Sequence, residues 1–131
     1  MTARFDFDPV NKILLVRPEG QLTNELTVEI YRAIRKYSIA TDARAGIWDM
    51  SGVTDFAMST ECIRSLAGME PAMPDDTRPR FIAVMRPSGY GLARMFQTIG
   101  AETRPLLEVV RTLDEALAAL GIQSPQFEPL E

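Results

Sequence analysis

The sequence has no histidine, one cysteine, one tryptophan and no long hydrophobic run. Without histidine, the chain lacks the commonest general base and the commonest transition-metal ligand. The single thiol, Cys62, cannot form an intrachain disulfide, and with no histidine beside it there is no basis for a zinc site. No apolar segment approaches the roughly 18 residues that span a bilayer. We therefore predict no catalytic residue, no metal, no cofactor and no membrane span.

The charge pattern also excludes a class of partner. The net charge is −4, from 14 basic and 18 acidic residues that are interspersed along the chain. No basic stripe is present that could neutralise phosphates, so nucleic acid is not expected as a partner. The N-terminal "MTARFDFDP" lacks the basic-then-apolar order of a signal peptide, which, with the lone cysteine, favours a cytoplasmic protein.

What the sequence does contain is the balance of a globular domain. Of 131 residues, 46% are hydrophobic and 24% are charged, and the length suffices for one buried core. We expect a single domain over residues 1–122. The segment 123–131 has no periodicity and is predicted to be a frayed tail.

Strand and helix patterns alternate along the chain. "ARFDFD" and "KILLVRP" predict a hairpin, and apolar residues at steps of three and four predict helices between the later strands. The expected order is β-β-α-β-α-β-α-β-α, an α/β fold with a five-stranded mixed sheet and about four helices, in which parallel strands are joined by right-handed crossovers. The strands are expected at 3–8, 12–18, 45–50, 80–86 and 106–111, and the first two helices at 24–38 and 59–69.

Capping residues support the helix boundaries. Thr112 and Glu115 stand at capping-box spacing at the start of "TLDEALAALG", and Gly121 ends that helix. The first helix has Thr23 or Asn24 as its cap. In "RPSGYG", Ser88 is expected to cap the third helix, which Gly100 would end.

Three segments resemble the STAS superfamily, the anti-sigma-factor antagonists with the SpoIIAA-like fold. They are "VRPEGQLT" after the hairpin, "DMSGVTDF" as third strand and turn, and "EVVRTLDEALAALG" as last strand and helix, and the resemblance covers roughly residues 5–120. The segment "FIAVMRPSGYGLARMFQTIG" is similar to the bacterial branch called STAS/SEC14-like. The resemblance implies a non-catalytic interaction or regulatory module with a protein partner. The branch implies an alternative, a carrier or sensor that holds a small apolar or lipid-like ligand between the sheet and the helices.

In regulatory members of that superfamily, a kinase phosphorylates a hydroxyl in an Asp-Ser pair at the start of the second helix. An ungapped alignment of "DMSGVTDF" places Ala57 and Met58 at that pair, with Ser59 and Thr60 one and two positions later. Ser59 and Thr60 are therefore candidate phosphoacceptors. Helix capping requires the same residue type at the same place, and we expect one of the two to be simply the cap.

Three further groups of residues are candidates for a site. Ser88, Gly89, Tyr90 and Arg94 form a candidate lip for an acidic ligand or anion, although "RPSGYGLAR" lacks the lysine of a P-loop and the third glycine of a dinucleotide fingerprint. A capped tight turn accounts for the same residues. Asp49 and Asp55 have no predictable third ligand to make a magnesium site, and Cys62 falls on the inward stripe of its helix as a small hydrophobe.

The expected topology has a consequence for association. Parallel strands in sequential order carry their crossover helices on one face of the sheet, which leaves the other face partly open. Trp48 or Val110 would be available on that face. An open apolar face is commonly a docking surface, so a homodimer or a protein partner is expected there or at the first strand's edge.

Overall fold

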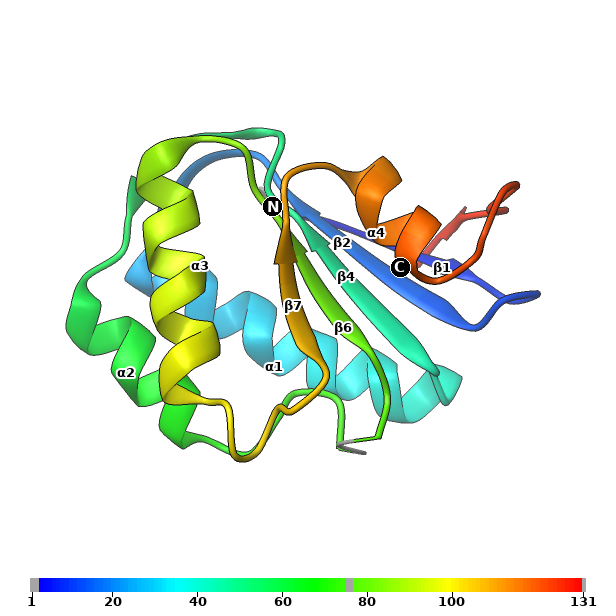
Figure 1. Cartoon of the computed structure of the whole chain (residues 1–131), viewed down its shortest axis with the longest axis horizontal. Helices are drawn as coiled ribbons and strands as arrows, with labels where there is room; N and C mark the ends of the chain where they lie inside the picture. Colours follow the sequence, from blue (N-terminus) through cyan, green and yellow to red (C-terminus); the bar gives the residue numbers. More distant parts are fainter. Residues whose placement is uncertain (1–2, 75–76, 131) are drawn as a thin grey trace.

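The computed structural model describes residues 3–74 and 77–130 (Figure 1). Within those residues there are four helices, α1 (Asn24–Thr41), α2 (Thr60–Gly68), α3 (Pro87–Ile99) and α4 (Leu113–Ala119). There are eight strands, β1 (Ala3–Asp8), β2 (Ile13–Pro18), β3 (Gly20–Thr23), β4 (Ala45–Asp49), β5 (Val53–Ala57), β6 (Arg80–Ala83), β7 (Leu107–Val110) and β8 (Glu128–Pro129). No helix in this part of the chain is long and apolar enough to cross a membrane.

The main sheet has the strand order β7-β6-β4-β2-β1-β8. β1 pairs antiparallel with β2, and β2, β4, β6 and β7 are parallel neighbours. The hairpin followed by parallel strands in sequential order is the mixed sheet that the sequence predicts. β6 ends at Ala83 rather than at residue 86, because α3 begins at Pro87 and the chain has to leave the sheet first.

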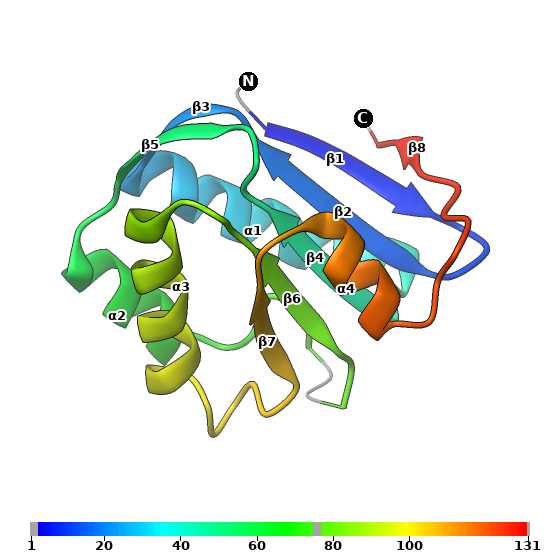
Figure 2. The same ribbon diagram turned by 45° about the horizontal axis from the view of Figure 1, so that its top comes forward.

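A second, two-stranded parallel sheet was not predicted. β3 and β5 pair with each other, apart from the main sheet (Figure 2). The chain leaves β2 at Pro18 and turns at Gly20, whose φ of +77° suits glycine. β3 then meets β5, which lies more than thirty residues further along the chain. Two short, polar strands paired over that separation leave no local pattern in the sequence.

The helices lie on both faces of the main sheet. Leu14 and Val16 of β2 point into a core cluster with Ile30 of α1 and Ala93 of α3, and α2 packs beside α3 (Figure 1). The intervening residues of β2, Ile13 and Leu15, face the opposite side, in a cluster with Ala116 and Leu117 of α4.

The expectation of helices on one face is therefore correct for the three crossovers and wrong for α4. No parallel strand follows α4 in the sheet, so the crossover rule does not constrain the side on which it packs. Trp48 packs against the cluster under α1 and α3, and Val110 packs against the cluster under α4. The sheet face that the sequence predicts to be open, and on which the predicted homodimer contact depends, is thus covered by α4.

The C-terminal segment is ordered along β1 instead of frayed. Asp6 and Phe7 pair with Pro129 and Glu128 of β8, and the Leu130 amide donates to the Phe5 carbonyl over 2.7 Å. Phe127 of the segment and Ile122, the residue before it, pack against the α4 cluster. This packing and the backbone pairing hold the segment, and they cover part of the edge of β1 at which the sequence predicts a protein contact.

Three helices begin at capping hydroxyls. Thr23 accepts from the Leu26 amide, Ser59 from the Cys62 amide and Thr112 from the Glu115 amide, at 3.2, 3.1 and 3.1 Å. α3 differs from its prediction: Arg86 is the N-cap residue without a side-chain hydrogen bond, and Pro87 occupies the first turn. Proline is suited to that position, so the helix starts before Ser88 and does not use its hydroxyl. Gly100 is the C-cap of α3, as predicted.

Candidate functional site

The connection between β5 and α2 holds both candidate phosphoacceptors. The Ser59 amide donates to Asn24 Oδ1 over 2.9 Å, and Asn24 Nδ2 lies 3.4 Å from Ser59 Oγ. Ser59 Oγ also caps α2, so this hydroxyl ties the start of α2 to the start of α1. Thr60 is exposed at the first position of α2. The two hydroxyls therefore differ in what they do, although they are adjacent in the sequence.

The connection is held against α3 by the contact between the Phe56 ring and Gly89. A Cβ placed on Gly89 would lie 2.4 Å from the Phe56 ring, far inside van der Waals contact. Glycine at position 89 therefore allows the first turn of α3 to approach Phe56 of β5. A Cβ on Gly91, two residues further along α3, would meet no atom within 4 Å. Gly89 serves close packing here, and its buried backbone faces the protein.

The four residues of the candidate lip lie in the first two turns of α3 and differ in exposure. Gly89 is buried, while Ser88 and Arg94 are exposed on α3. Tyr90 is half-buried and its ring lies beneath the guanidinium of Arg111, with 5.6 Å from the guanidinium carbon to the ring centroid. The partner of Tyr90 is thus an arginine after β7. Sequence reasoning missed Arg111 because the contact joins residues of two elements.

Arg111 also lines a groove at the carboxyl ends of the parallel strands. The groove has a volume of about 520 Å³. It is lined by the last residue of β4 and by residues that follow β4, β6 and β7, namely Asp49, Met50, Ser51, Met85, Arg86, Pro87, Arg111, Thr112 and Leu113. Asp49 is buried and accepts from the Ser51 amide and hydroxyl at 3.0 and 3.2 Å. Its carboxylate is therefore engaged in closing the turn after β4.

The structure does not pair Asp49 with Asp55. Asp55 is exposed on β5 and accepts from the Gln21 side chain over 3.0 Å. Among the described residues, no group of three His, Cys, Asp or Glu side chains could hold a metal ion. Cys62 is half-buried, and its burial, followed by the charge of Glu25, raises the pKa of the thiol above its ordinary value. A thiol of this kind is a weak nucleophile at neutral pH.

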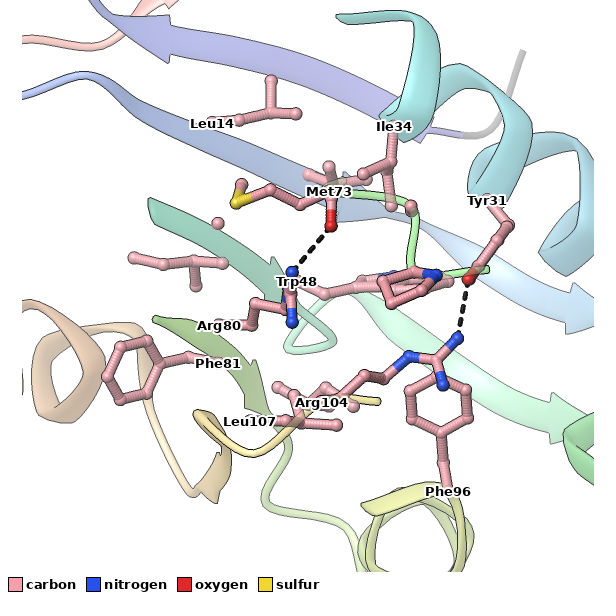
Figure 3. A pocket seen from close by; sticks show the side chains of 16 residues that line it. Leu14, Tyr31, Ile34, Trp48, Met73, Arg80, Phe81, Phe96, Arg104 and Leu107 are labelled. Carbon is pink, nitrogen blue, oxygen red and sulfur yellow. Dashed lines mark hydrogen bonds between the residues drawn. The ribbon is translucent and has the colours of Figure 1, made fainter. Parts of the chain in front are cut away.

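Between the main sheet and helices α1 to α3 lie two small apolar cavities. Their volumes are about 80 Å³ and about 40 Å³. Tyr31, Trp48, Ile82 and Phe96 line both of them, so the cavities lie against the same side chains. Figure 3 shows Trp48 extending from β4 toward Tyr31, with Met73 and Arg80 on the other side of the larger cavity. Neither cavity is of a size for an acyl chain, because a 150 Å³ cavity is about what benzene requires.

One wall of the larger cavity contains a buried arginine whose partners are neutral. Arg104 is 3% exposed and donates to the carbonyls of Leu66, Ala67 and Met69 at the end of α2, at distances of 3.1, 2.9 and 3.0 Å. It also donates to the Tyr31 hydroxyl over 2.8 Å, and its guanidinium lies 4.8 Å from the Phe96 ring centroid (Figure 3). The cation thus meets the negative end of the α2 dipole and joins α1, α2 and α3.

No protein-family model matches the chain, and no curated protein shows significant sequence similarity to it. Among solved structures, the chain is similar to the anti-sigma factor antagonist SpoIIAA in its unphosphorylated form, with 17% identity, a TM-score of 0.55, and coverage of 85% of this chain and 91% of that one. A structure of the Bacillus cell fate determinant SpoIIAA in the phosphorylated form has 22% identity, covers 84% of this chain and 92% of that one, and has a TM-score of 0.49. At these identities the similarity concerns the fold. The chain has the SpoIIAA-like α/β fold that its sequence resemblance implied.

Proposed function

We propose that the chain is a non-catalytic regulatory module that acts by docking a protein partner, in the manner of an anti-sigma factor antagonist. The observation that carries the proposal is the SpoIIAA-like fold, which aligns over 85% of the chain with a protein described by that role. The chemistry of the candidate residues agrees with docking. The acidic groups at Asp49 and Asp55 are engaged separately, and the only thiol has a raised pKa.

We place the docking surface on the β5–α2 connection. Ala57, Ser59 and Thr60 are exposed there, at the position where the superfamily resemblance expects a regulatory surface. The backbone below them is fixed from two sides, by Phe56 against Gly89 and by Ser59 against Asn24. A surface that is already ordered pays little conformational entropy when a partner binds.

The hydroxyls on this surface support docking without a phosphorylation cycle. The positions aligned with the Asp-Ser pair are Ala57 and Met58, neither of which can accept a phosphate. Ser59 Oγ, the next hydroxyl, already caps α2 and contacts Asn24. We therefore propose that the partner recognises the surface as it stands, and that neither Ser59 nor Thr60 has to be modified.

Affinity capture with matched surface variants tests the docking proposal. Ala57→Arg places a long cation on the β5–α2 connection, and Ala118→Arg places the same side chain on the exposed side of α4, across the main sheet. We expect wild type and Ala118→Arg to retain a common protein from the source organism's lysate in a saturable manner. Ala57→Arg should lose at least nine-tenths of it, because a buried, unpaired charge opposes docking. Equal retention by both variants, or no saturable binding by wild type, would contradict the proposal.

A further inference from the structure

We propose that the groove at the carboxyl ends of β4, β6 and β7 binds a small, soluble organic phosphate, a phosphate monoester of a compact apolar group. The proposal does not depend on protein docking, because no residue that lines the groove belongs to β5, α2 or their connection. The volume of the groove, about 520 Å³, is within the range of small-molecule sites.

The groove lies where two neighbouring parallel strands send the chain to opposite faces of the sheet. β6 is followed by α3, which packs on the same face as α1, and β7 is followed by α4, which packs on the other face (Figure 2). The two connections therefore diverge and leave a crevice beyond the ends of the strands. In open α/β sheets, ligands bind in crevices of this kind at the carboxyl ends of the strands.

Two arginines on the diverging connections make the groove positive. Arg86 follows β6 and Arg111 follows β7, and both side chains are exposed. In the part of the chain that the structure describes, neither arginine takes part in an ion pair. The one carboxylate in the lining belongs to Asp49, which is buried and accepts from Ser51. Two such cations, in a chain whose net charge is −4, favour an anionic ligand.

The contacts of Arg111 leave its guanidinium free to bind oxygen atoms. Its guanidinium carbon lies over the Tyr90 ring, 5.6 Å from the centroid, and this contact uses the face of the guanidinium rather than its N–H edge. The nearby Glu115 carboxylate accepts from the Arg111 amide over 3.2 Å. A guanidinium binds phosphate oxygens in pairs, and the charge of two arginines matches that of a phosphate monoester, about −1.5 to −2 at pH 7.

The apolar part of the lining determines the other half of the ligand. Met85 is 60% exposed, and Met50, Pro87 and Leu113 add further apolar surface to the groove. Methionine side chains adapt to different shapes and make favourable contacts with aromatic rings. Inorganic phosphate would leave this wall in water, whereas an apolar or aromatic group attached to the phosphate would cover it.

Three probes separate the two halves of the ligand. Phenyl phosphate carries both halves, phenol carries the ring without the phosphoryl group, and inorganic phosphate carries only the anion. NMR spectra of the chain follow the methionine methyl groups and the backbone amides. We expect phenyl phosphate to shift the Met85 methyl signal and the amide signals of residues 111–113 in a saturable manner. Phenol and inorganic phosphate should each bind about tenfold more weakly, because each lacks one kind of contact.

Matched variants locate the site. Arg86→Gln and Arg111→Gln each remove an exposed cation from the groove and should weaken phenyl phosphate about tenfold. Arg94→Gln removes an exposed cation of α3 that does not line the groove, and should bind within about twofold of wild type at about 0.15 M salt, where distant charges are screened. Met85→Ala should weaken phenyl phosphate and leave inorganic phosphate unchanged. Circular dichroism establishes that each variant is folded.

Four results would overturn the proposal. The first is a response of the folded wild type to phenyl phosphate no larger than its response to sodium chloride at the same ionic strength. The second is an equal loss of binding in Arg94→Gln and in the two groove variants. The third is equal binding of phenyl phosphate and inorganic phosphate, which would mean an adventitious ion only. The fourth is co-sedimentation with phosphatidylcholine vesicles that contain phosphatidic acid, without a response to phenyl phosphate, because the phosphate would then be recognised on a membrane.

Discussion

Arg104 is the residue on which three helices depend. Its guanidinium satisfies three carbonyls at the end of α2 and the hydroxyl of Tyr31 on α1, and it lies against Phe96 of α3. An arginine can do this because its planar head carries five donors in a fixed geometry, which a lysine does not. Nothing in "ETRPLLE" indicates such a role, since the carbonyls that Arg104 binds lie 35 to 38 residues earlier in the chain.

Replacing Arg104 should be among the most destabilising changes in the chain. Arg104→Met keeps much of the apolar stem but leaves several buried carbonyls without a donor, so we expect a loss of about 3 kcal/mol in the free energy of unfolding. Arg94→Met on the exposed side of α3 is the control and should stay within about 0.5 kcal/mol of wild type. Urea unfolding followed by circular dichroism measures both. Equal stability of the two variants would show that the Arg104 bonds contribute little.

The adjacent hydroxyls of Ser59 and Thr60 should have unequal effects. Ser59→Ala removes the N-cap bond to the Cys62 amide and the contact with Asn24, and should cost about 1 kcal/mol. Thr60→Ala changes an exposed residue in the first turn of α2 and should cost less than about 0.5 kcal/mol. Thermal unfolding of the two variants makes the comparison. A larger loss at Thr60 would mean that the cap has been assigned to the wrong hydroxyl.

At the scale of elements, α3 and β5 are in contact because position 89 has no side chain. Gly89→Ala would force the Phe56 ring to move by more than a small adjustment, because its added Cβ would lie 2.4 Å from that ring. Gly91→Ala, in the same helix, meets nothing within 4 Å and gains helix propensity. We expect Gly89→Ala to be destabilising by about 1–3 kcal/mol and Gly91→Ala to be stabilising by up to about 1 kcal/mol. Chemical unfolding distinguishes them, and the same sign for both would contradict the packing.

The β1–β2 hairpin and the C-terminal segment meet at Asp8. Burial acts to raise the pKa of Asp8, but hydrogen bonds from the Asn11 side chain and from the amides of Asn11, Gln126 and Val10 outweigh it and lower the pKa below its ordinary value. A carboxyl group with a lowered pKa stabilises the folded state above its unfolded pKa of about 3.9, and that contribution disappears as the pH falls through the folded value.

The stability of the hairpin should therefore depend on pH through Asp8. We expect Asp8→Asn to be less stable than wild type at pH 7, and the difference to shrink progressively below about pH 4. The amide proton of Gln126, which donates to Asp8 Oδ2 over 3.1 Å, should exchange faster in the variant at neutral pH. Unfolding curves at several pH values measure the first effect. A difference that is constant from pH 7 to pH 3 would show that the Asp8 charge is not involved.

At the scale of the whole molecule, sequence patterns predicted the parts that rest on local signals. The hairpin, the three crossover helices and the Thr112 cap each have a periodicity or a residue pair within one turn or strand. The second sheet, the side on which α4 packs and the pairing of β8 with β1 depend on residues far apart in sequence. For the candidate site, hydroxyls could be located near a helix start, but the Ser59–Asn24, Phe56–Gly89 and Tyr90–Arg111 contacts each join different elements.

The central claim is that a protein partner docks on the β5–α2 connection of a SpoIIAA-like domain. Hydrogen–deuterium exchange of the chain, free and with its captured partner, tests this claim most directly. We predict slower exchange in peptides over residues 53–68 on binding, and unchanged exchange in peptides over Leu113–Ala119 on the other face of the main sheet. Slower exchange confined to α4, with peptides over residues 53–68 unchanged, would contradict the claim.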